Sequence, residues 1–148
     1  MSGFYGTSGV EVNRVERITN SLPQTAQEVM FTITGRIKIL DIIGEVTTQI
    51  GAVPNATKLV SNPTVGADVD LCGTLDINAH TVGTMYSISG TFANAMIATT
   101  SGALEAQANP VVLTAGSLDL NCVANATGAI KWTILYELMD EDSKIVAA

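Results

Sequence analysis

DVDLCGTLDIN, residues 68–78, alternates apolar and polar positions without a miss. Its apolar positions are Val69, Leu71, Gly73, Leu75 and Ile77, and its polar positions are Asp68, Asp70, Cys72, Thr74, Asp76 and Asn78. Side chains of a β-strand point to opposite faces with a period of two, so this stretch predicts one strand with a buried and a solvated face. The same pattern returns near the end of the chain, in Ile130, Trp132, Ile134, Tyr136 and Leu138.

Segments of this kind follow one another along the chain, and helical periodicity is almost absent. The expected strands are residues 10–18, 29–34, 36–50, 57–61, 68–78, 84–89, 90–100, 111–114, 117–124 and 129–138. About ten short strands, separated by turn residues, predict an all-β protein. We expect a single-domain β-sandwich over residues 10–139, with a jelly-roll-like topology. Residues 1–9 are expected to form a flexible N-terminal arm, and residues 140–148 a C-terminal tail.

The composition limits the kinds of partner. The chain has 148 residues, a formal net charge of −7 and only 14% charged residues. So few charges are common where partner subunits cover much of a protein surface. The basic residues are scattered, whereas nucleic-acid binding needs clustered cations, so no direct nucleic-acid ligand is expected. One modest basic group is interpreted as the polar faces of two neighbouring strands, with an anion site as the alternative: Arg14, Arg17, Arg36 and Lys38.

Hydropathy gives no reason to expect a membrane protein. No stretch approaches the roughly 18 to 20 consecutive apolar residues that span a bilayer. Residues 1–10 lack the basic flank and the apolar centre of a signal peptide. We therefore expect no membrane association and a protein made in a cytosol.

Enzyme motifs are missing from the sequence, and no cofactor is expected. His80 is the only histidine, so a catalytic triad or a zinc site would depend on it alone, and we interpret it as a turn residue. Neither a phosphate-binding loop nor a nucleophile elbow is present. Asp68 and Asp70 would lie about 7 Å apart on one strand face. We interpret them as an exposed acidic stripe, and a glycoside-hydrolysing pair is the alternative.

Three further groups have both a structural and a functional interpretation. Residues 140–142 lack the spacing of a calcium loop and are interpreted as solvated tail, or else as ligands of a cation shared across a symmetric interface. Cys72 and Cys122 are expected to be buried thiols, with a disulfide between them as the alternative. Trp132, with Tyr136 and Tyr86, is expected in the core, although such aromatics also form sugar-stacking platforms.

Phe4 and Tyr5 lie in the glycine-rich segment 1–9. A frayed terminus is the structural interpretation of this segment. The functional interpretation is an arm whose two aromatic residues anchor it on a neighbouring subunit. Phe4 and Tyr5 are therefore the candidate partner-contact residues.

The amino-acid sequences of several expected strands resemble those of one protein family. The matching strings are TGRIKILDIIGEVTT (34–48), TKL (57–59) with NPT (62–64), DLCGTLDI (70–77), AGSLDLNC (115–122) and GAIKW (128–132). They are similar to the capsid decoration, or cement, proteins of tailed bacteriophages, and the resemblance extends over roughly residues 10 to 140. None of these strings is a contact motif, so no binding residue is transferred from the family.

The resemblance implies a non-enzymatic β-sandwich that forms homotrimers and stabilises an icosahedral head. Such proteins sit on the outer capsid surface and bridge neighbouring major capsid protein subunits, after synthesis in the host cytoplasm. The alternative is a head-fibre, tail or carbohydrate-binding module for host attachment. One packing expectation is added: Gly73 leaves a gap in the core face, where Trp132 of the opposite sheet fits.

Overall fold

The computed structural model describes residues 11–19 and 21–148. These residues form twelve β-strands and no helix, so the prediction of an all-β sandwich is confirmed. The part of the chain that is described therefore holds no helix with the length and apolar character to span a membrane. Phe4 and Tyr5, with the whole segment 1–9, lie outside the described residues.

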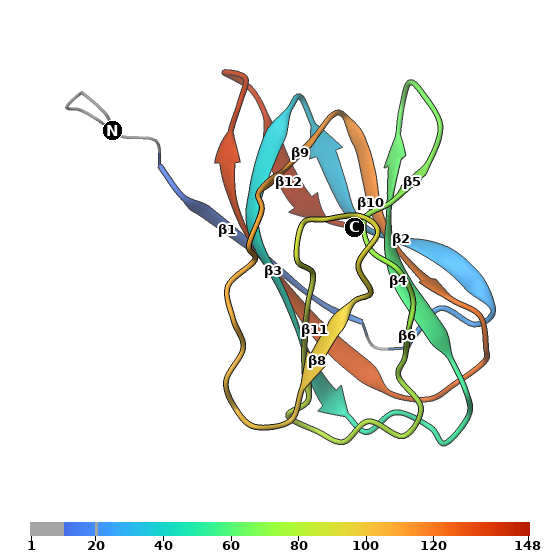
Figure 1. Ribbon diagram of the computed structural model, residues 1–148. Coiled ribbons are helices and arrows are strands. Elements are labelled where there is room, and N and C mark those ends of the chain that lie inside the picture. The colour runs from blue at the N-terminus through green and yellow to red at the C-terminus, as the bar shows by residue number, and fades with distance from the viewer. Residues whose placement is uncertain (1–10, 20) are drawn as a thin grey trace.

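The strands form two six-stranded sheets (Figure 1). The first sheet has the order β1 (Asn13–Thr19), β11 (Ala129–Leu138), β3 (Ile37–Thr48), β7 (Met85–Ser87) and β8 (Ile97–Thr99), and β9 (Val111–Leu113) also pairs with β3. The second has the order β12 (Lys144–Ala147), β2 (Ala26–Thr34), β10 (Gly116–Cys122), β4 (Ala56–Pro63) and β5 (Val69–Asp70), and β6 (Leu75–Asp76) also pairs with β4. Paired strands are antiparallel. The chain passes repeatedly from one sheet to the other, and the jelly-roll-like topology stays a prediction.

The stretch 68–78 is not one strand, and that prediction is wrong. It forms two short strands, β5 and β6, which pair with different ends of β4. Between them the backbone turns away from β4, because Gly73 donates to the Asn94 carbonyl at 2.8 Å and accepts from Met96 N–H at 3.0 Å. Leu71 and Ile77 are buried as expected, whereas Val69 is exposed.

The expected C-terminal tail is part of the domain. Within residues 140–148, β12 pairs with β2, and Ile145 is buried in the core. Ala148 N–H donates to the Met30 carbonyl at 2.9 Å, so the ladder continues to the last residue. The tail prediction failed because the acidic residues before this strand hid the alternation of Lys144–Ala147. The segment 90–100 is likewise mostly turns, with only Ile97–Thr99 as a strand.

Trp132 lies in the core on top of Gly44, not of Gly73. In the ladder Gly44 stands between Trp132 of β11 and Tyr86 of β7, and both aromatic side chains are fully buried. Because Gly44 has no side chain, the two rings stack above it with centroids 6.2 Å apart. The expected role of Gly73 is therefore wrong: a Cβ there would meet the backbone of Ala95, at 3.3 Å.

Gly44→Ala is expected to destabilise the domain. A Cβ at this position would lie 2.8 Å from the Trp132 ring, so the ring has to move. Overpacking of this kind costs about 1 to 3 kcal/mol, and thermal unfolding followed by circular dichroism measures it. The control is the same substitution in a Trp132→Leu background, where the missing ring makes the added methyl group less costly. An equal loss in both backgrounds would contradict the assignment.

Candidate functional site

The three aromatic residues considered as a sugar platform are in the interior. Trp132 and Tyr86 are fully buried and Tyr136 nearly so, which confirms the core interpretation and excludes the platform. His80 extends the stack toward the surface, because its ring lies on Tyr86 with centroids 5.6 Å apart. Its Nδ1 is 2.6 Å from the Tyr86 hydroxyl. His80 therefore orients a buried tyrosine, and no nucleophile among the described residues hydrogen-bonds to it.

The three aspartates of the segment 68–76 are each held by the protein. Asp70 forms an ion pair with Lys58 at 2.8 Å, and Asp68 accepts from Gln27 Nε2 at 3.0 Å. Asp76 accepts hydrogen bonds from the backbone N–H groups of Asn55 and Asn78, and these bonds lower the pKa of its carboxyl. The three carboxylates are exposed as expected, but they do not form one stripe on one strand, because Asp70 belongs to β5 and Asp76 to β6.

A buried carboxylate, Asp119 on β10, was missed by the sequence analysis. It lies on the outer side of the second sheet and accepts from Ser117 Oγ at 2.6 Å and from Gln27 Nε2 at 2.9 Å. Asn62 Nδ2 completes the network at 3.4 Å. Nothing in the local pattern indicates that this side chain is buried, because Asp119 alternates with Leu118 and Leu120 as a solvated residue would. The polar network is structural and joins β2, β10 and β4.

Metal-binding chemistry is not assembled in the described part of the chain. No group of three or more His, Cys, Asp or Glu side chains gathers there. The carboxylate considered as a cation ligand, Asp140, instead binds the Arg36 guanidinium at 2.8 Å. Its pKa is lowered by this hydrogen-bonded ion pair.

The expected basic group is divided among structural partners. Arg14 pairs with Glu16, and Arg17 Nε donates to the Ala148 carbonyl at 3.2 Å. With Arg36 on Asp140, three of the four cations contact acceptors of this chain. The prediction of two neighbouring strand faces is wrong in its placement, because β11 lies between β1 and β3 and Arg36 precedes β3.

Both cysteines are free and buried, as expected, so the alternative of a disulfide is excluded. The Cys122 sulfur accepts from Thr57 Oγ1 at 3.6 Å, and the Cys72 sulfur from Leu59 N–H at 3.5 Å. Burial raises the pKa of both thiols, so neither is an activated nucleophile.

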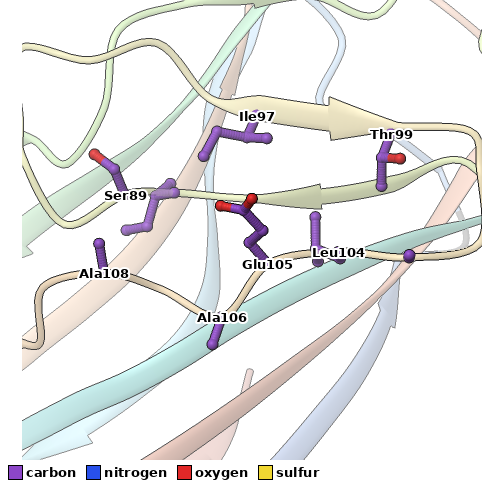
Figure 2. Close-up of a pocket in the computed structure, with 9 residues that line it drawn as sticks. Ser89, Ile97, Thr99, Leu104, Glu105, Ala106 and Ala108 are labelled. Carbon is purple, nitrogen blue, oxygen red and sulfur yellow. The ribbon is translucent and has the colours of Figure 1, made fainter.

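A cavity of about 410 Å³ lies between the β7–β8 pair and the loop that precedes β9. Figure 2 shows Glu105 of this loop directed into the space, with Ile97 and Thr99 on the opposite side. Small alanine side chains form much of the remaining wall, at positions 103, 106 and 108. Glu105 is an isolated carboxylate here, without a second acid or a histidine in the lining.

A second cavity, of about 250 Å³, is bordered by exposed apolar side chains. We call it the apolar groove, and define it by Val65, Val69, Phe92 and Val112, which are all exposed and all line it. They come from the turn after β4, from β5, from the β7–β8 connection and from β9. The sequence analysis missed the groove, because its residues are far apart in the chain and none belongs to a motif.

Comparison with known proteins gives no relative: no family model, no curated protein and no solved structure matches the chain. The site is therefore defined by its own geometry. Among the described residues, that geometry offers a surface suited to contact with another protein and no assembled catalytic group.

The His80 imidazole is expected to titrate below its ordinary pKa of 6.5. Burial lowers this pKa, and the nearby Asp76 carboxylate opposes the shift only in part. A lowered folded-state pKa means that the unfolded chain binds the proton more tightly, so this contribution to stability is complete above pH 6.5 and is lost as the pH falls through the folded-state value. NMR titration of this single histidine measures the midpoint directly.

Tyr86→Phe supplies the control for that titration. It removes the hydroxyl 2.6 Å from Nδ1 and leaves in place the burial that lowers the His80 pKa, so the midpoint should stay below 6.5. A midpoint at or above 6.5 in the unmodified protein would show that the imidazole is not desolvated as described.

Proposed function

We propose that this protein is a non-enzymatic virion structural protein, which decorates the capsid of a tailed bacteriophage and stabilises it by bridging neighbouring major capsid subunits. The resemblance of its strand sequences to cement proteins supports the capsid assignment. The apolar groove is the observation that supports a binding role, because it offers a surface for another protein. The homotrimer stays a prediction that rests on the resemblance.

The groove differs from the ordinary apolar exposure of a soluble protein. Single exposed apolar residues are common on protein surfaces, whereas several around one hollow are typical of protein contact sites. Val65 is 87% exposed, and Phe92 and Val112 are about half exposed, at 45% and 51%. An aromatic side chain beside a concave apolar surface is also the usual centre of binding energy at an interface.

We propose that the occupant of the groove is an apolar side chain or loop of the major capsid protein. The groove has no charged residue in its lining, which contains only aliphatic, aromatic, proline, glycine and hydroxyl-bearing residues. Depletion of charge at the centre of the contact, with polar residues at the rim, is the usual composition of such interfaces. Repetition of this contact over an icosahedral shell adds avidity to a modest single affinity.

The carbohydrate-binding alternative has lost its proposed platform. Trp132, Tyr86 and Tyr136 are buried, and Phe92 is the one exposed aromatic residue among residues 11–19 and 21–148. A single exposed phenylalanine, with no second aromatic ring to form a stacking platform, is a poor glycan site. A head-fibre or tail role would use the same apolar contact, so the particle to which the protein binds distinguishes these roles from decoration.

Val112→Asp is expected to weaken binding to purified phage heads. A buried, unpaired carboxylate in a central contact is strongly unfavourable, so affinity should fall by about tenfold or more. The measurement is co-sedimentation of the protein with heads and, separately, with tails. Val82→Asp is the matched control, because Val82 is 62% exposed and does not line the groove. Equal binding by both variants would contradict the groove as the contact, and binding to tails alone would contradict decoration.

The arm prediction has its own test. Replacement of Phe4 and Tyr5 by alanine should weaken head binding and leave the unfolding transition unchanged, because an arm that anchors on a neighbouring subunit contributes to the contact and not to the fold. Alanine at Ser2 and Thr7 is the control, because it changes the same segment without removing an aromatic ring. If heads bind both variants as tightly as the unmodified protein, Phe4 and Tyr5 are not contact residues.

A further inference from the structure

Strand β1 is an edge strand with one unused side. It pairs along its whole length with β11 and with no other strand among the described residues. The edge strand of the second sheet, β12, packs beside β1 without pairing with it, and Arg17 Nε donates to the Ala148 carbonyl across this gap. An unpaired edge of seven residues is a template for another strand unless the protein blocks it. β1 contains no proline, and no β-bulge interrupts its pairing with β11.

The outer face of β1 has an ordered pattern of side chains. Arg14 and Glu16 lie on either side of its central Val15 position, Ile18 lies near its C-terminal end, and Val12 immediately precedes the strand. The two apolar residues are 53% and 55% exposed. A charged pair between two exposed apolar residues is not the pattern of an edge that is merely protected by charge.

This pattern is complementary to itself in one antiparallel register. If two copies of β1 pair about Val15, Arg14 of each copy lies opposite Glu16 of the other. The same register places Val12 of each copy opposite Ile18 of the other. Opposite charges and apolar pairs directly across two strands are each stabilising. Registers centred on Arg14 or on Glu16 would instead place like charges opposite each other.

We infer that β1 pairs with β1 of a second copy of this chain across a two-fold axis at Val15. The pairing joins the first sheets of two molecules into one continuous sheet and covers Val12 and Ile18. The backbone hydrogen bonds and the apolar contacts supply the affinity. The exposed ion pairs contribute little energy and fix the register instead. A self-complementary patch of this kind is what a two-fold homodimer requires.

This inference is independent of the proposed function. It uses the opposite side of the first sheet from the apolar groove, because β9 joins β3 on the side away from β11 and β1. It also differs from the homotrimer that the resemblance implies, so the mass of the free assembly distinguishes the two arrangements.

The test uses two charge reversals, R14E and E16R, and their mixture. Sedimentation velocity should give a mass of two chains for the unmodified protein. Each single variant should dimerise about tenfold more weakly or worse, since like charges then face each other. An equimolar mixture of the two variants should recover the dimer, because every acidic side chain again faces a basic one. The double variant R14E/E16R should recover it as well. E105R, in the loop before β9, is the control and should leave the dimer unchanged.

A second variant tests the register independently of charge. Val15→Cys places one thiol from each copy on the two-fold axis, where opposite residues of an antiparallel pair have Cα atoms about 4.5 to 5.5 Å apart. That separation suits a disulfide, so mild oxidation should yield a covalent dimer. Val29→Cys, an exposed position on β2, should not yield one. The inference is overturned by a one-chain or three-chain mass for the unmodified protein. It is also overturned by a mixture that stays monomeric, or by equal cross-linking at positions 15 and 29.

Discussion

The close packing of Trp132 over Gly44 is the constraint on which the centre of this sandwich depends. Gly44 is the point where the ladders of β11, β3 and β7 meet, and the absence of a side chain lets Trp132 reach Tyr86. Tyr86 in turn holds His80 through its hydroxyl. A row of stacked rings therefore runs from the deepest part of the core to a surface turn, and joins three strands that are far apart in sequence.

The sequence was most informative where a strand has partners on both sides. The alternation of Ile130–Tyr136 predicted the buried face of β11 correctly, because β1 and β3 hold this strand in register over its length. The equally regular alternation of residues 68–78 led to the wrong prediction of one continuous strand, because β5 and β6 lie at a sheet edge. There the backbone bonds to Asn94 and Met96 instead of continuing along β4. Periodicity reports the pattern of side chains, whereas strand continuity depends on which partner supplies the hydrogen bonds.

The surface features could be predicted only in part, for a related reason. The interpretation of His80 as a turn residue and the burial of Cys72 and Cys122 follow from local sequence, and the structure agrees with them. The apolar groove depends on residues as distant as Val65 and Val112, which meet only when the two sheets pack. Asp119 shows the converse: its local pattern is that of a solvated residue, and its burial comes from side chains of neighbouring strands.

The positions of the two exposed apolar surfaces have a consequence for assembly. The groove lies on the side of β3 that faces β9, whereas the edge of β1 lies beyond β11 on the other side of the same sheet. One molecule can therefore bind a second copy through β1 and leave its groove accessible. Because a two-fold axis relates the two copies, the inferred pair would present two identical grooves. Two such contacts on one rigid body would suit the proposed bridging of neighbouring capsid subunits, because each alone is small and their combination adds avidity.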